Sequence, residues 1–105
     1  MHIEVSTDNT IDGSETLTNL ITDLVQQELA HLDGHITRIE VHLSDPSTGT
    51  TGPEEKHCML EARLKGHQPT VVKHAALTLE QATKGAARKM KSSLESALGK
   101  LSDRH

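Results

Sequence analysis

Residues Thr78–Leu101 read TLEQATKGAARKMKSSLESALGKL, and the other elements of the chain are organised around this stretch. Apolar residues recur in it at steps of three or four, which is the spacing of one face of an α-helix. They are Leu79, Ala82, Ala86, Met90, Leu94, Ala97 and Leu101. Thr78 and Gln81 form a capping-box pattern at its start. The stretch therefore predicts one helix roughly 36 Å long, enough to lie across a small sheet.

Basic residues flank this apolar stripe on both sides, and only Glu80 and Glu95 oppose them. The basic residues of the first flank are Lys84, Arg88 and Lys91, and those of the second are Lys89 and Lys100. Such charges suit a solvated helix face that keeps a domain soluble. They also suit a surface that binds phosphate groups. The helix alone leaves both interpretations open.

Composition narrows the class of protein. The chain has 105 residues and no Phe, Tyr or Trp, so one domain spanning residues 1–105 must build its core from aliphatic side chains. No apolar run approaches the roughly 18 residues of a membrane span, and no signal-peptide pattern follows Met1. Cys58 is the one cysteine, which fits a reducing compartment. We expect a cytoplasmic protein that does not contact a membrane.

Charge is divided unevenly along the chain. Residues 1–55 hold eleven acidic residues and one basic residue, Arg38, which gives a net charge of −10. Residues 56–105 hold ten basic and four acidic residues, which gives +6. This asymmetry predicts a bipolar surface with one pole suited to polyanions.

Five further segments have the pattern of a strand or a helix. Period-two alternation of apolar and polar residues predicts strands, and these are His2–Ser6, Ile36–Asp45, Lys56–Lys65 and Thr70–Ala75. A helix begins after the N-cap Ser14 and runs to about Leu32, and Gly34 suits a left-handed C-cap. The stretch 46–53 is a loop by composition.

The element order is thus β-α-β-β-β-α, and we expect an α+β two-layer sandwich. A helix joins the first two strands, so they should be parallel with a right-handed crossover, and the remaining strands should be antiparallel. Each strand is apolar on one side only, which places both helices on one face of a four-stranded mixed sheet and Cys58 in the core. The residues expected on the hydrated opposite face are Arg38, Glu40, His42, His57, Glu61, Arg63 and Lys65.

The sequence contains no pattern typical of catalysis or metal binding. Its eight histidines come without C-x-x-C or H-E-x-x-H spacing, and Cys58 faces away from them. A glycine-rich phosphate loop is absent, and so are the aromatic residues that stack RNA bases on a sheet. We therefore expect no catalytic residues, metal, cofactor or small-molecule substrate, and any RNA to be bound through its backbone.

Four runs of residues together resemble the ribosome hibernation-promoting factor family, also called ribosome-associated inhibitors or sigma-factor modulators. They are IEVSTDN at 3–9, RIEVHLSD at 38–45, KHCMLEARLKGHQP at 56–69 and the A-x-x-G-A-A-x-K pattern at 82–89. The resemblance implies the β-α-β-β-β-α fold and a bacterial, non-enzymatic protein. It further implies binding to the small ribosomal subunit between head and body, where messenger and transfer RNA would lie. The chain resembles the short form of the family, which implies a monomer off the ribosome.

The resemblance also suggests which residues would contact ribosomal RNA. A lysine near the middle of the family's second helix corresponds to Lys89, and basic positions around it correspond loosely to Lys84, Arg88 and Lys91. From their charge alone, Arg63, Lys65 and Lys73 extend this set. The first helix departs from the family, because Glu28 and His31 stand where typical members have lysines.

Two functions follow from these observations. The first is a ribosome-associated translation inhibitor whose cations bind rRNA phosphates while its body blocks the decoding channel of idle ribosomes. The second is a protein-interaction module with the same fold, which docks a basic partner through its acidic first helix. If that helix points away from the RNA, neutralising Asp23 or Glu28 should change affinity only weakly.

Overall fold

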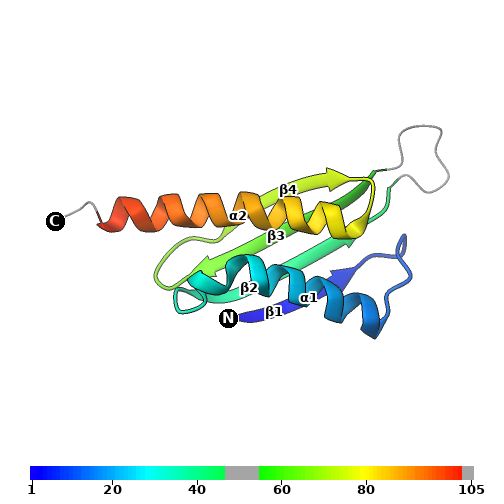
Figure 1. Cartoon of the computed structure of the whole chain (residues 1–105), viewed down its shortest axis with the longest axis horizontal. Coiled ribbons are helices and arrows are strands. Elements are labelled where there is room, and N and C mark those ends of the chain that lie inside the picture. The colour runs from blue at the N-terminus through cyan, green and yellow to red at the C-terminus, as the bar shows by residue number, and fades with distance from the viewer. Residues whose placement is uncertain (47–54, 103–105) are drawn as a thin grey trace.

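The predicted element order is confirmed in the computed structural model, which describes residues 1–46 and 55–102 (Figure 1). The elements are β1 (His2–Thr7), α1 (Glu15–Leu29), the 3₁₀ turn η1 (Ala30–Leu32), β2 (Ile36–Ser44), β3 (Lys56–Leu64), β4 (Thr70–Ala76) and α2 (Leu79–Ser102). Apart from Pro46, the loop expected at 46–53 lies outside the described residues.

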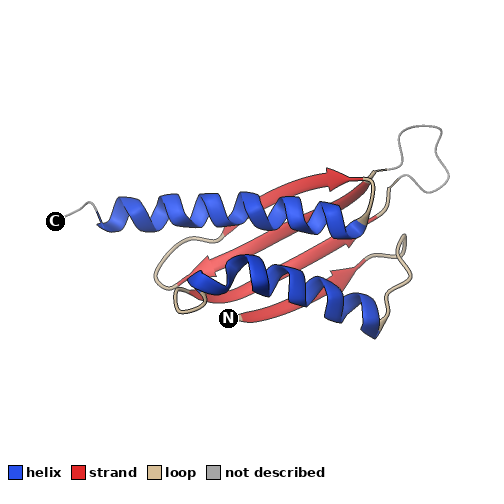
Figure 2. Cartoon of the chain, in the orientation of Figure 1, coloured by secondary structure: helices blue, strands red, loops and turns tan. Residues whose placement is uncertain are grey.

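The sheet has the predicted mixed topology. Its strand order is β1-β2-β3-β4, with β1 parallel to β2 and the other neighbours antiparallel. Both helices cover the same face of this sheet and lie side by side (Figure 2). The opposite face carries no helix, so it is open along the described strands.

Both helices begin at the predicted caps. The Ser14 hydroxyl accepts a hydrogen bond from the Leu17 N–H at 3.1 Å, and the Thr78 hydroxyl accepts one from the Gln81 N–H at 3.1 Å. The prediction for Gly34 is wrong: among the described residues, positive φ occurs at Gly66 alone. The turn η1 ends the first helix instead, and the Asp33 N–H closes it on the Ala30 carbonyl at 3.2 Å.

The core lies between the sheet and the two helices. Cys58 is 1% exposed and pairs with Leu43, which confirms the register assigned to its strand. From α2 the predicted residues Ala82, Ala86, Met90 and Leu94 are buried, and so are Thr83 and Ala87, which lie beside the predicted stripe. The Thr83 hydroxyl is satisfied within the helix, donating to the Leu79 carbonyl at 2.7 Å.

A close approach between α2 and β4 fixes how the helix lies on the sheet. A Cβ atom at Gly85 would stand 2.1 Å from Cδ2 of His74, a distance that van der Waals radii forbid. The missing side chain therefore lets the imidazole pack directly against the helix. This contact brings the middle of α2, with its basic residues, over the edge strand β4.

Candidate nucleic-acid interface

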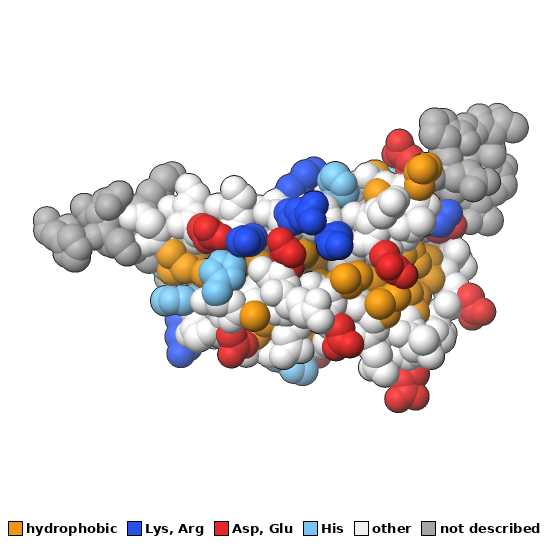
Figure 3. Space-filling model, in the orientation of Figure 1, with side chains coloured by type: hydrophobic (Ala, Val, Ile, Leu, Met, Phe, Trp, Pro, Cys, Tyr) orange, Lys and Arg blue, Asp and Glu red, His pale blue; other side chains and the backbone are white. Residues whose placement is uncertain are grey.

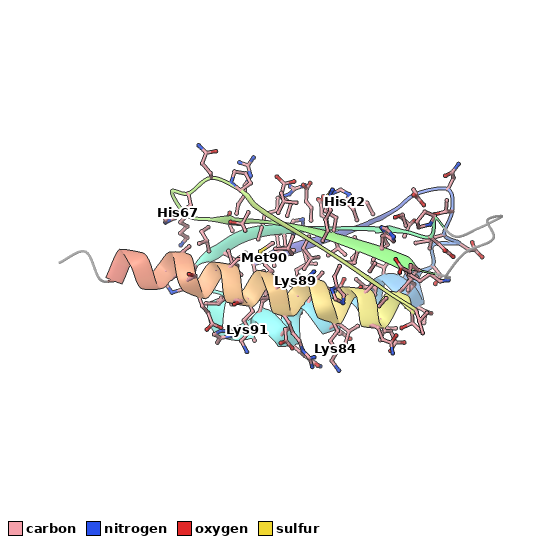
Figure 4. All side chains as sticks on the ribbon, turned by 90° about the horizontal axis from the view of Figure 1, so that it is seen from above. His42, His67, Lys84, Lys89, Met90 and Lys91 are labelled. Carbon is pink, nitrogen blue, oxygen red and sulfur yellow. The ribbon has the colours of Figure 1, made fainter. Side chains whose placement is uncertain are left out.

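Three of the predicted cations form a row on α2. Lys84, Arg88 and Lys91, here called the basic row, follow one another at helical spacing along α2. Lys84 and Lys91 lie on the side of α2 that faces away from the sheet (Figure 4). Lys84 and Arg88 are exposed and Lys91 is half-buried. In the space-filling view, Lys and Arg side chains gather over the middle of this helix (Figure 3). Their spacing of three or four residues puts them within reach of neighbouring phosphates on one strand of nucleic acid.

The acidic first helix borders this row. Glu28 Oε1 lies 3.9 Å from Arg88 Nε, with side-chain exposures of 25% and 66%. His31 Nε2 lies 3.2 Å from Glu95 Oε1, a second polar contact between α2 and the end of the first helical segment. Because α1 and α2 lie in the same layer, the first helix does not point away from a ligand on the basic row. For a ligand on the basic row, the condition under which a weak effect of Glu28 was expected is therefore not met.

Lys89 lies on the other flank of α2 and reaches β4. Its Nζ donates a hydrogen bond to the backbone carbonyl of Lys73 at 2.8 Å. Lys73 is exposed and belongs to the edge strand. Helical spacing correctly predicted that Lys89 lies on a different flank from the basic row. Its contact with Lys73 could not be predicted in this way, because it depends on how α2 is positioned on the sheet.

The remaining two predicted cations lie apart from α2. Arg63 is exposed on the open face of the sheet, paired in register with Arg38 of the neighbouring strand. Lys65 is exposed just after β3, where its N–H donates to the His35 carbonyl at 3.2 Å. The seven predicted residues therefore occupy three places: the outer side of α2, the β4 edge, and the open face with its adjoining turn.

A row of glutamates crosses the open face. Glu4, Glu40 and Glu61 are paired in register across β1, β2 and β3. Arg38 Nη2 contacts Glu4 Oε2 at 2.6 Å and Glu40 Oε1 at 3.0 Å. The hydrogen bond from Arg38 lowers the pKa of Glu40 below its usual value, and Glu40 together with Glu4 raises the pKa of Arg38. Three carboxyl groups on neighbouring strands make this row unsuited to a polyanion.

The described residues offer no site for metal or thiol chemistry. Within residues 1–46 and 55–102, no group of three or more His, Cys, Asp or Glu side chains could hold a metal ion. Burial raises the pKa of the Cys58 thiol to about 11, so it stays protonated at neutral pH. In the same part of the chain, no helix is long and apolar enough to span a bilayer.

Solved structures of other proteins share this fold. A ribosomal subunit interface protein from Coxiella burnetii is similar with a TM-score of 0.70 at 15% identity, covering 94% of this chain and 99% of that one. The N-terminal domain of Protein Y from Thermus thermophilus is similar with a TM-score of 0.66 at 17% identity, covering 91% and 98%. At these identities the likeness shows the fold alone.

Sequence comparison identifies the family. No curated protein matches the chain as an individual relative. Residues 3–102, nearly the whole chain, match the family described as "Sigma 54 modulation protein / S30EA ribosomal protein". The order of strands and helices and the two solved folds agree with that match. The chain belongs to the sigma 54 modulation protein / S30EA ribosomal protein family.

Proposed function

We propose that this protein associates with the ribosome and inhibits translation by binding the small subunit in idle ribosomes. The observation that carries the proposal is the basic row on α2, in which Lys84 and Arg88 are exposed, in a domain whose family is described as ribosomal. Such a protein works in the cytoplasm, acts by occupying space and needs no catalytic group. Its body fills the channel that messenger and transfer RNA would use.

In this proposal the contacts are with the rRNA backbone. Lys84, Arg88 and Lys91 bind phosphates along one side of α2, because ammonium and guanidinium groups pair with phosphate oxygens. Lys89 and Lys73 continue the positive surface around the β4 edge. Arg63 and Lys65 add contacts wherever RNA reaches the open face or the turn after β3.

The test is co-sedimentation with purified small subunits. Lys84→Glu with Arg88→Glu reverses two charges of the basic row, and we expect affinity to fall by at least about tenfold, which equals 1.4 kcal/mol. Both side chains are exposed, so the far-ultraviolet circular dichroism spectrum should not change. Messenger and transfer RNA added beforehand should compete with the wild-type protein.

A matched control separates the site from net charge. Arg88→Gln with Lys84→Gln lowers the net charge by two, and so does Asn9→Asp with Gln68→Glu, at two exposed positions outside α2. The first pair should weaken sedimentation with subunits and the second should not. Equal effects would refute the basic row as the binding surface. Full binding by the reversed variant would favour the alternative module, which docks a basic protein through α1.

A further inference from the structure

A groove crosses the open face of the sheet, on the side opposite the helices. Its volume is about 630 Å³, within the range of ordinary ligand sites. One wall is a row of side chains paired in register across all four strands, Ser6, His42, Met59 and Lys73. The other wall includes Ser44 and His57, the next outward pair. His42 points away from the helices (Figure 4).

The groups that line this groove are chiefly hydrogen-bond donors. Lys73 carries a positive charge, and the imidazoles of His42 and His57 can each donate an N–H. Among the described lining residues, Asp8 is the one carboxylate. Its Oδ1 already accepts from the Thr10 N–H at 2.9 Å and from the Thr10 hydroxyl. This donor set suits an anion and offers few ligands to a cation.

Two lysines from different elements line the β4 end of the groove. Lys89 of α2 reaches this end and donates one hydrogen to the Lys73 carbonyl at 2.8 Å. A lysine ammonium has three hydrogens, so two remain for a ligand. The hydrogen bond holds the Lys89 ammonium at the backbone of Lys73. The β4 end is therefore the most cationic part of the groove.

The glutamate row limits where an anion can lie. Glu4, Glu40 and Glu61 stand one outward row from His42, on the side away from His57. Two of these carboxylates contact Arg38, which offsets part of their charge. An extended polyanion would therefore follow the groove across the strands and not spread over the whole open face.

We propose that this groove binds the sugar–phosphate backbone of a single-stranded RNA segment, with a phosphate held between Lys73 and Lys89. Three gaps of about 4.8 Å separate the first strand from the last, so the groove is about 14 Å long and accepts more than one phosphate. The protein has no Phe, Tyr or Trp, so we expect the groove to bind the RNA backbone and not to read its sequence. The inference deepens the proposed function by adding a second RNA surface, and it rests on that function for the source of the RNA.

The experiment is nuclear magnetic resonance mapping with a short oligouridylate. We expect amide shifts at Leu43 and Cys58, whose backbones line the groove, as well as at His74. Lys73→Gln should lower affinity by about threefold or more and make the salt dependence shallower by about 0.7, the contribution of one phosphate on a single strand. Lys56→Gln removes the same charge from the neighbouring strand, outside the groove lining, and should bind like wild type.

The outcomes distinguish this site from the proposed function itself. Amide shifts confined to α2, together with wild-type affinity of Lys73→Gln for the oligonucleotide, would overturn the proposal of RNA binding in the groove. The proposal of ribosome binding through the basic row would not be affected. Tighter binding of uridine monophosphate than of the oligonucleotide would overturn the assignment to an RNA strand. The oligonucleotide could instead shift the amides of the groove while the basic-row variants still sediment with small subunits like wild type. That result would support RNA binding in the groove and count against the basic row as the ribosome-binding surface.

Discussion

Glu28 is the acidic residue that contacts the basic row. Its carboxylate stands 3.9 Å from the Arg88 guanidinium, where the family resemblance implies a lysine in typical members. It therefore competes with any phosphate for Arg88. Since Arg88 is mostly exposed, solvent screens much of this interaction, and pairs of this kind contribute about 0.2–1 kcal/mol.

We predict that Glu28→Gln raises affinity for small subunits by about two- to fivefold at low salt. The change frees Arg88 and removes a negative charge beside the basic row. Asp23→Asn is the matched control, because Asp23 is exposed on a different side of α1 and loses the same charge. Sedimentation titrations measure both variants. Equal gains would mean that net charge, and not the contact with Arg88, controls binding.

The buried thiol of Cys58 links stability to alkaline pH. Burial raises its pKa from the usual 9.0 to about 11, while the hydrogen bond with Thr83 works in the opposite direction. The unfolded chain therefore releases this proton at a lower pH than the folded one. Stability from this group is complete below pH 9.0 and is lost as pH rises towards about 11.

We predict that the free energy of unfolding of the wild type falls more steeply over this pH range than that of Cys58→Ala. The difference should reach about 2–3 kcal/mol, at about 1.36 kcal/mol for each pKa unit. Urea titrations followed by circular dichroism measure it, since the chain has no aromatic residue for fluorescence. Lysines titrate in both proteins and cancel in the comparison. Parallel pH profiles would show that the thiol is not linked to folding.

At the scale of the element, α2 shows what a sequence pattern contains and what it omits. The spacing of Ala82, Ala86, Met90 and Leu94 predicted the buried face, and Thr78 predicted its start. The burial of Thr83 and Ala87 was missed, because a helix that packs against both a sheet and a neighbouring helix buries a wider face than one stripe. Residue type likewise predicted which cations would face solvent. Their division among the outer side of α2, the β4 edge and the open face follows from tertiary packing alone.

Gly85 provides a test of how α2 is seated. Ala has the higher helix propensity by about 1 kcal/mol, yet its Cβ would collide with the His74 ring. We predict that Gly85→Ala destabilises the protein by about 1–3 kcal/mol. Gly99→Ala has no heavy atom within 4 Å of the new Cβ and should not destabilise it. Urea unfolding measures both.

The double variant Gly85→Ala with His74→Ala separates collision from other causes. Removing the imidazole opens the space that the new methyl group needs, so most of the loss relative to His74→Ala alone should disappear. If the losses of stability from Gly85→Ala and from His74→Ala simply add in the double variant, the imidazole must move aside in Gly85→Ala. The close approach would then not determine the position of α2.

At the scale of the whole molecule, opposite charges are interleaved more closely than the sequence suggested. The two halves of the chain carry net charges of −10 and +6, which favoured two separate poles. Folding instead places the acidic α1 beside the basic α2. On the open face, the glutamate row lies next to the row that contains His42 and Met59. The order of elements and the topology were predictable from period and turn chemistry. The pairing of charges was not, because it depends on which elements become neighbours.

Salt dependence tests this arrangement as a whole. Three phosphates on the basic row should make log affinity for small subunits fall by about 2–3 for each tenfold rise in salt. Lys84→Gln should reduce that slope by about 1. Sedimentation at several potassium concentrations gives both slopes, with magnesium held constant to preserve the subunits. Binding that does not vary with salt would exclude phosphate contacts as the source of affinity.

The hydrogen bond between Lys89 and the Lys73 carbonyl also affects how copies of the protein behave towards one another. β4 is an edge strand, and the exposed backbone of such strands can recruit another strand and start aggregation. Lys89 brings a charge from a distant helix to this edge, where Lys73 already adds its own. Two approaching β4 edges would bring like charges together. We therefore expect Lys89 and Lys73 to oppose pairing between two β4 edges, a role separate from any contact with RNA.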